Sequence, residues 1–154
     1  MSPLSDLPET TSAPLSGERL RALVAPMIRG TMVERCGMEM VELDAQGGIM
    51  TMPVAGNTQP AGLLHGGATI ALAESIASFA AMLQAREVLG EGAQAVGASV
   101  SALHHRSARA GTVTATCAVR HAGRQVASYL VDVRDESEAL LSTITVQTML
   151  LPPR

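Results

Sequence analysis

The sequence contains almost no aromatic residues: its 154 positions include one Tyr, one Phe and no Trp. Proteins that bind single-stranded nucleic acid stack bases on aromatic rings, and nucleic-acid-binding domains in general carry clustered basic charge. This chain has a formal net charge of -3 at pH 7 and a pI near 5.8. The lack of both features argues against nucleic acid as a partner.

Cysteine is scarce as well, and long uncharged hydrophobic runs are absent. Cys36 and Cys117 lie far apart without a paired spacing, which favours reduced core or strand residues over a disulfide or a metal framework. No stretch of about 18 apolar residues is free of charge, and the first residues lack the basic-then-apolar order of a secretory signal. We therefore expect a cytoplasmic protein with no membrane segment.

The composition suits a single globular domain. With 47% hydrophobic residues, a chain of this length can bury a core of its own. Residues 1–16 are rich in Pro, Ser and Thr without apolar periodicity, so we expect a disordered segment there and one domain over 17–154. Ser16 can cap a short helix over 18–25, which Pro26 and a glycine four residues later would end.

Six apolar segments read as strands. The first alternates with polar residues, and the first two flank Gly47-Gly48, which predicts a hairpin with the glycine pair as its turn. Short turn-like separators join the last four, which predicts antiparallel neighbours in a four-strand meander. The six segments are 38–43, 49–54, 95–103, 112–119, 126–133 and 139–149.

Between the hairpin and the meander lies a long segment without proline, from Gly66 to about Arg86, dominated by Ala, Leu and Met. As a helix it would span roughly 31 Å, and its apolar residues occur on all sides, as in a helix that other structure encloses. Hairpin, helix and four strands in this order predict an α+β fold in which one antiparallel sheet curls around one helix.

A glycine pair at the start of this helix and a single acid within it suggest a site. The first backbone N–H groups, near Gly66 and Gly67, have no partner inside the helix and can hold a developing oxyanion. Glu74 and Ser78 are four residues apart and share one face. The simpler alternative is that Glu74 lies on a solvated strip and that the glycines form an ordinary turn.

The spacing of several residues around this point resembles the acyl-CoA thioesterases of the hotdog fold. The similarity extends over about 33–149 and is greatest to the branch that hydrolyses aryl-type thioesters. That branch includes 1,4-dihydroxy-2-naphthoyl-CoA hydrolases, 4-hydroxybenzoyl-CoA-type enzymes and the proofreading thioesterase of enterobactin synthesis. The matching residues are Gln59, Gly62, His65-Gly66-Gly67, Glu74 and Ser78.

The resemblance implies a catalytic role for five residues. The Gly66 N–H would bind the carbonyl oxygen of the thioester, and Glu74 would attack the carbonyl carbon or activate a water molecule. Gln59 and Ser78 would hold the hydrolytic water, and His65 would position the carbonyl or assist the departing thiolate. Considered singly, Gln59 could be a loop amide, Ser78 a helix hydroxyl bonded to its own backbone, and His65 a cap.

Two further segments match places where the family contacts coenzyme A. His104 and Arg106 correspond to a histidine and an arginine at a strand end, and Gly123 and Arg124 to a turn along the phosphate and pantetheine. Arginine forms paired, charge-assisted bonds to phosphate, although both arginines could instead be solvated turn charges. His104 and His105 are adjacent on a predicted strand and point to opposite faces, which argues against a shared metal ion.

The resemblance also implies an assembly. Family members pair through their sheets, often form tetramers, and build each active site across the subunit interface, so Gln59, His65 and Gly66 would face Glu74 and Ser78 of the partner. Unpaired sheet edges give a physical reason for at least a dimer. Coenzyme A enters as part of the substrate, and no cofactor or metal is expected.

The acyl group stays open. Ser101 and Leu103 stand where polar amides often precede the His-His-Arg segment, and the pocket would be lined by Ala, Leu, Met and Ile, which accept a flat ring or an aliphatic chain alike. A broad or medium-chain acyl-CoA thioesterase is therefore the first alternative to an aryl-CoA enzyme. A non-catalytic acyl-CoA binding module and a hotdog dehydratase are further alternatives, and a carrier-protein thioester could replace free coenzyme A.

Overall fold

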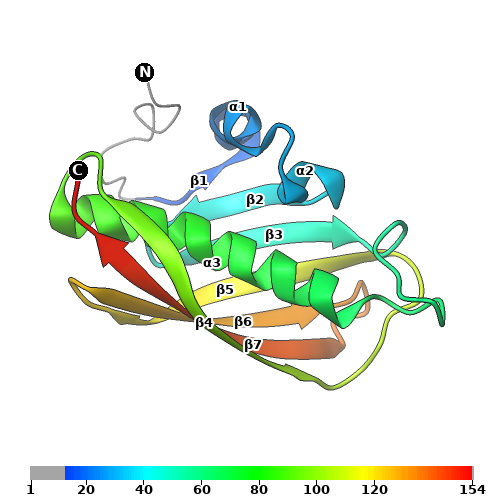
Figure 1. Cartoon of the computed structure of the whole chain (residues 1–154). Coiled ribbons are helices and arrows are strands. Elements are labelled where there is room, and N and C mark those ends of the chain that lie inside the picture. The colour runs from blue at the N-terminus through cyan, green and yellow to red at the C-terminus, as the bar shows by residue number, and fades with distance from the viewer. Residues whose placement is uncertain (1–12, 154) are drawn as a thin grey trace.

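One antiparallel sheet of seven strands curves around a single long helix, α3 (Figure 1). The computed structural model describes residues 13–153. The expected α+β class, with a curved sheet wrapped around one central helix, is confirmed. The elements are β1 (Leu15–Ser16), α1 (Gly17–Ile28), α2 (Met32–Arg35), β2 (Glu39–Asp44), β3 (Gly47–Pro53), α3 (Gly66–Leu89), β4 (Gln94–His104), β5 (Thr112–Ala122), β6 (Val126–Arg134) and β7 (Leu140–Leu151).

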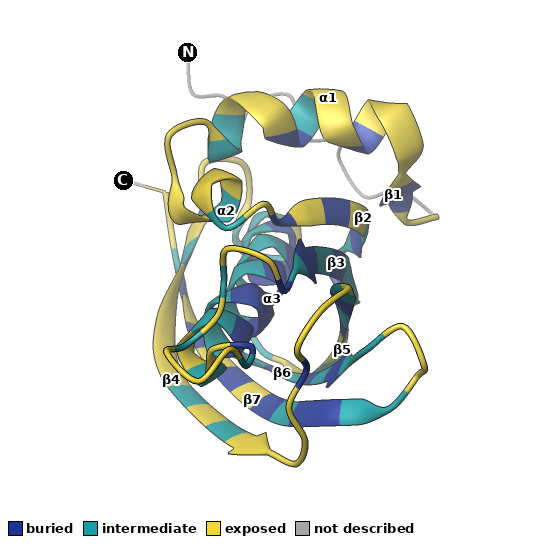
Figure 2. Ribbon diagram, turned by 90° about the vertical axis from the view of Figure 1, so that its right-hand side faces the viewer, coloured by how far each residue is buried: buried dark blue, intermediate teal, exposed yellow. Residues whose placement is uncertain are grey.

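Helix α3 begins at Gly66, as predicted, and continues three residues beyond the expected end to Leu89. Gly90 ends it with φ of 95°, and the Gly90 N–H donates to the Arg86 carbonyl. By length and composition α3 could cross a membrane, but the core helix of a globular fold passes the same test. Here the sheet wraps it, and Figure 2 shows its buried residues inside the curve. Five of the ten buried residues are alanines, which let the sheet approach closely.

The predicted meander is wrong in one respect, because β4 does not pair with β5. The strand order is β1-β2-β3-β5-β6-β7-β4, so β5, β6 and β7 form a meander, β5 also pairs with β3, and β4 lies at the far edge beside β7. The segment between β4 and β5 crosses from β7 to the residues that follow β3. Ala108 and Gly111 accept hydrogen bonds from the backbone of Leu64 and Val54, and this carries the chain across to β3.

The β2–β3 hairpin is confirmed, but its turn is not the glycine pair. The turn is formed by Ala45 and Gln46, and both glycines lie within β3. They are needed there for space. A β-carbon on Gly47 would lie 2.0 Å from the Cys117 carbonyl oxygen, and one on Gly48 would lie 2.3 Å from the carbonyl oxygen of a β2 residue.

The segment expected to be disordered lies mostly outside the described residues, and its last part forms β1, which pairs with β2. Helix α1 starts after Ser16, but the Ser16 side chain makes no capping hydrogen bond. The helix also passes through Pro26 and ends two residues later, contrary to prediction. Pro26 and Ala22 are both exposed, so water can solvate the Ala22 carbonyl that Pro26 leaves without a donor.

Candidate active site

The loop that leads into α3 is a tight turn held by its own backbone. The Gln59 N–H donates to the Leu63 carbonyl at 2.8 Å, and the Gly62 N–H donates to the Gln59 carbonyl at 2.9 Å. Gly62 has φ of 74°, a conformation that glycine adopts without strain. The Gln59 side chain is half-buried, and its oxygen accepts a long hydrogen bond from the Ala61 N–H at 3.4 Å.

At the start of α3 one backbone donor is occupied and its neighbour is free. His65 is the N-cap residue, and its Nδ1 accepts a hydrogen bond from the Gly67 N–H at 2.8 Å. The neutral ring therefore carries its proton on Nε2. The Gly66 N–H donates no hydrogen bond to any residue that the structure describes. A free donor thus lies at the positive end of a 24-residue helix, where a negative charge is stabilised.

A cavity of about 190 Å³ brings together four of the predicted site residues, Gln59, Gly66, His104 and Arg106. The His104 ring stands against Gly66, since a β-carbon built on that glycine would lie 2.9 Å from its Nε2. The rest of the wall is Leu63, Leu64, Thr69, Ser107, Ala108, Leu141 and Ser142.

Glu74 and Ser78 lie elsewhere on α3. Both side chains are half-buried, and the backbone of Glu74 lies about 12 Å from that of Gly66 along the helix axis. The Glu74 carboxylate points at β4, because a β-carbon built on Gly97 would lie 2.7 Å from its Oε1. No hydrogen bond or ion pair to Glu74 occurs within residues 13–153. In one chain the proposed acid and the proposed oxyanion donor therefore belong to separate groups.

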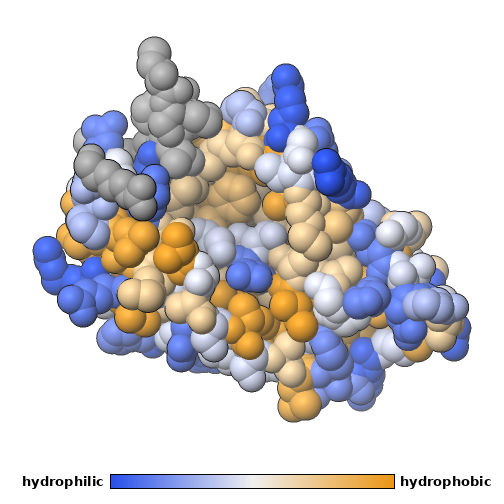
Figure 3. Space-filling view, viewed as in Figure 1, coloured by the Kyte–Doolittle hydropathy of each residue, from blue (hydrophilic) through white to orange (hydrophobic). Residues whose placement is uncertain are grey.

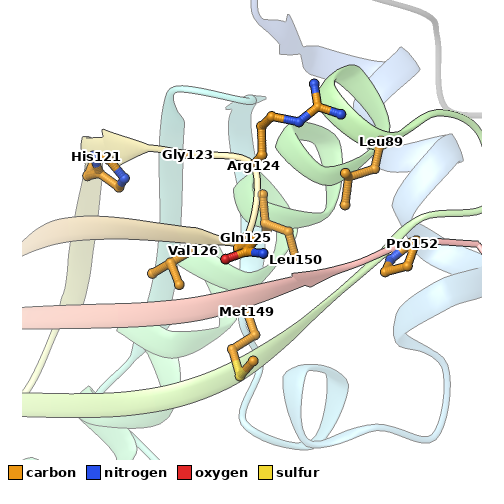
Figure 4. Close-up of a pocket in the computed structure, with 9 residues that line it drawn as sticks. All are labelled: Leu89, His121, Gly123, Arg124, Gln125, Val126, Met149, Leu150 and Pro152. Carbon is orange, nitrogen blue, oxygen red and sulfur yellow. The ribbon is translucent and has the colours of Figure 1, made fainter.

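Gly123 and Arg124 form a third group at the β5–β6 turn. They line a cavity of about 960 Å³, which Leu89 at the C-terminal end of α3 also lines, so this group lies at the opposite end of the helix from Gly66 (Figure 4). Gly123 has no room for a side chain: a β-carbon would lie 2.7 Å from His121 Nε2 and 2.8 Å from the Val126 carbonyl oxygen.

His104 is the last residue of β4 and His105 is the residue after it, and their rings contact successive residues of β7 whose side chains point to opposite faces of the sheet. His104 Nδ1 lies 2.8 Å from Ser142 Oγ, and His105 Nε2 lies 3.0 Å from Thr143 Oγ1. Ser142 is buried and belongs to the wall of the small cavity. The sequence analysis missed Ser142. It is a polar residue at an inward-facing position of an apolar strand, but that signal becomes visible only once the strand register is known.

The hydrogen bond from the Ser137 hydroxyl is the main cause that holds the pKa of Asp135 below its ordinary value, and the charge of Arg106 contributes a smaller part.

In the part of the chain that the structure covers, no three His, Cys, Asp or Glu side chains come close enough together to hold a metal ion.

The edge strand β4 exposes most of its length. Its pairing is with β7 alone, and the large hydrophobic side chains of Val96 and Leu103 are exposed by 45% and 63%. Met149, the β7 partner of Val96, is exposed by 48%. Figure 3 shows hydrophobic side chains along the course of β4, mixed with hydrophilic ones.

Comparisons with known proteins agree with this architecture. Residues 61–142 match the family model of the thioesterase superfamily. The proofreading thioesterase EntH of Cronobacter turicensis is 39% identical over 133 residues, which cover 86% of this chain and 93% of that protein. The crystal structure of a thioesterase from Haemophilus influenzae is 30% identical, covers 94% of each chain and superposes with a TM-score of 0.79.

A protein of Staphylococcus aureus, called a thioesterase in one of its structures, has been solved as two alanine variants. One replaces a glutamate and the other a glutamine. Those structures are 28% and 27% identical to this chain, each covers 79% of this chain and 98% of that one, and both have TM-scores of 0.72. Fold, family model and relatives lead to one conclusion: the chain belongs to the hotdog-fold thioesterase superfamily and is a thioester hydrolase.

Proposed function

We propose that this protein hydrolyses acyl-CoA thioesters, with aryl-CoA esters as the preferred substrates. The observation that carries the proposal is the pair of unengaged groups on α3. The Gly66 N–H is a free donor at the positive end of the helix, and the Glu74 carboxylate has no partner among the described residues. A donor for an oxyanion and a free carboxylate are the two groups that hydrolysis of a thioester needs.

The reaction follows from these two groups. The thioester oxygen accepts a hydrogen bond from the Gly66 N–H, and a Glu74 oxygen bonds to the carbonyl carbon. When the tetrahedral intermediate collapses, the carbon–sulfur bond breaks and coenzyme A leaves as a thiolate, which then takes a proton. Water cleaves the resulting anhydride. In the alternative route Glu74 removes a proton from water, which attacks directly; Gln59 and Ser78 hold this water in either route.

The site requires a second copy of the chain. Because Glu74 and Gly66 belong to separate groups in one chain, we propose that Glu74 and Ser78 of one subunit meet Gln59, His65 and Gly66 of its partner. The long exposed edge of β4 is a natural surface for pairing, since an unpaired strand edge offers a row of free backbone groups. A homodimer is the smallest assembly that satisfies this, and a tetramer is the next step.

The Staphylococcus aureus variants support the choice of residues. The altered glutamine and glutamate of that protein are residues 32 and 47, a separation of 15. Gln59 and Glu74 have the same separation, since 74 − 59 = 15.

Coenzyme A would be held by two groups of residues. We propose that His104 and Arg106 contact it near the small cavity and that Gly123 and Arg124 contact it at the β5–β6 turn. These groups lie at opposite ends of α3, about 36 Å apart along the axis, so the coenzyme contacts at one site also come from different subunits. No further cofactor is needed, and we expect the protein to act in the cytoplasm.

The choice of acyl group rests on the similarity to a proofreading thioesterase. A broad or medium-chain aliphatic specificity is the second candidate, because the apolar side chains that line the small cavity are Leu and Ala, and no Phe, Tyr or Trp is among its described wall residues. Thiol release from benzoyl-, naphthoyl-, short-chain and medium-chain acyl-CoA separates the two. Activity in the wild type that is lost in Glu74→Gln supports the mechanism; no release from any ester would leave only acyl-CoA binding.

Mixing two inactive variants tests the shared site. Glu74→Gln and a variant that lacks the Gly66 donor are each inactive alone. In a random mixture half of the dimers are mixed, and each mixed dimer has one intact site of two, so about one quarter of the wild-type activity returns. A mixture that stays inactive while mixed dimers form would show that each site is built within one chain.

A further inference from the structure

Ser142 and His104 form a contact that the proposed mechanism does not yet use. The Ser142 hydroxyl lies 2.8 Å from His104 Nδ1, and Ser142 is 2% exposed. The same ring presents Nε2 to Gly66, at 2.9 Å from where a β-carbon would stand. Ser142, His104 and Gly66 all line the small cavity. One side of the ring is therefore fixed, and the other side faces the place where the thioester carbonyl is expected.

The environment of Ser142 determines which nitrogen of His104 carries the proton. A serine hydroxyl needs an acceptor for its hydrogen, and a buried polar group normally has a partner. Within residues 13–153, His104 Nδ1 is the only partner of the Ser142 side chain. Ser142 therefore donates to Nδ1, and the neutral ring carries its hydrogen on Nε2, directed toward Gly66.

We propose that His104, held in this orientation by Ser142, donates from Nε2 to the thioester carbonyl oxygen beside the Gly66 N–H. This rests on the function proposed above and adds a second oxyanion donor, with Ser142 as the positioning residue. His65 is less well placed for this task, because its Nδ1 caps the helix and its side chain does not line the small cavity. The carbonyl oxygen thus receives one backbone and one side-chain hydrogen bond, the usual composition of an oxyanion hole.

The neighbouring pair supplies a matched control. His105 follows the last residue of β4, Thr143 follows Ser142 in β7, and the two make the same kind of ring–hydroxyl contact at 3.0 Å, although the Thr143 hydroxyl also donates to Asp132 at 3.5 Å. That contact lies on the opposite face of the sheet, and neither residue lines the small cavity. A general effect of losing a hydroxyl between β4 and β7 would appear in both pairs, whereas a catalytic effect would appear only in the first.

The kinetic test uses single and double variants of the full chain with an acyl-CoA ester that the wild type hydrolyses. Removal of an oxyanion donor costs about 10² in kcat or more, so His104→Ala should lower kcat about 100-fold, in addition to any rise in KM from its contact with coenzyme A. His104→Gln keeps a donor and should restore part of the rate. Ser142→Ala should lower kcat about 10-fold in the wild type and have no further effect in His104→Ala, while Thr143→Ala should change nothing.

Three results would overturn the proposal. A rise in KM with unchanged kcat in His104→Ala would make His104 a coenzyme contact only. An effect of Ser142→Ala that persists in the His104→Ala background would make the serine structural. An equal loss in Thr143→Ala would have the same meaning.

A second measurement needs no substrate. The chain has four histidines, so long-range proton–nitrogen NMR spectra of the imidazole rings can be assigned with single variants. His104 should show the hydrogen on Nε2, and Ser142→Ala should shift the His104 Nδ1 signal while Thr143→Ala does not. A His104 ring with its hydrogen on Nδ1 would refute the orientation. If no thioester is hydrolysed, the proposed function fails, and this spectrum still decides whether Ser142 orients His104.

Discussion

Replacing Gly66 with proline tests the oxyanion donor directly. Gly66 is the first residue of α3, a position that proline favours, and the replacement removes an N–H group that has no partner among residues 13–153. The preceding residue must be extended, and His65 already is, with φ of -71° and ψ of 126°. Gly66→Pro therefore removes a donor without breaking a hydrogen bond or the helix.

Gly66→Ala is the matched variant. It adds the same β-carbon, which meets His104 Nε2 at 2.9 Å, but it keeps the N–H. Both variants displace the His104 ring, so the ratio of their rates cancels that effect and reports the replacement of the N–H hydrogen by the proline ring carbon. Loss of one oxyanion donor costs about 3 kcal/mol, and kcat of Gly66→Pro should fall about 100-fold or more below that of Gly66→Ala. Steady-state thiol release gives both values, and thermal unfolding checks that the two fold equally well. Equal rates in the two folded variants would refute the role of the Gly66 N–H.

Three further outcomes follow from the structure. Gly97→Ala places a β-carbon 2.7 Å from the Glu74 carboxylate, which must move by about 0.7 Å to reach an ordinary contact of 3.4 Å. Since a misplacement of about 1 Å can cost 100-fold, kcat should fall at least several-fold while the urea midpoint of unfolding stays within error. An unchanged kcat would mean that Glu74 is not the catalytic acid. Burial, with a smaller contribution from a nearby acid, raises the pKa of the Cys117 thiol to about 12. At pH 8 a thiol reagent should therefore label half-buried Cys36 and reach Cys117 only on unfolding. Because the unfolded thiol ionises near pH 9, the free energy of unfolding should decline as the pH rises from about 9 toward 12. Tyr129→Phe removes a buried hydroxyl that donates at 3.3 Å to a backbone carbonyl of the β2–β3 turn. The free energy of unfolding, measured with urea, should fall by about 1 kcal/mol. A rise in that free energy would mean that this hydrogen bond does not stabilise the fold.

Local features of the fold could be predicted because each depends on nearby residues. The start of α3 follows from a glycine pair before a run of good helix formers, and the opposite directions of His104 and His105 follow from strand geometry. The failures also have local causes. Gly47 and Gly48 look like a turn, yet they are needed where β3 passes close to carbonyl oxygens of its neighbours, and no short-range pattern separates these two uses.

The site itself could be predicted only in part, because its geometry depends on strand order. His104 and Gly66 are 38 residues apart in sequence, and they meet only because β4 runs along the edge of the sheet beside β7. The sequence analysis predicted β5 as the neighbour of β4, whereas the structure pairs β4 with β7. Ser142 could not be assigned either, since its partner is fixed by the pairing of His104 with β7. The fold and the residue roles could therefore be predicted from family resemblance, whereas the contacts between these residues could not.

The exposed edge of β4 has a consequence for how the rate depends on the amount of enzyme. If the acid and the oxyanion donor come from different copies, a lone chain has no complete site, and only the associated fraction turns over substrate. Well below the dissociation constant of the dimer, that fraction grows in proportion to concentration. The measured velocity should then rise with the square of the protein concentration, and it should become linear once association is complete.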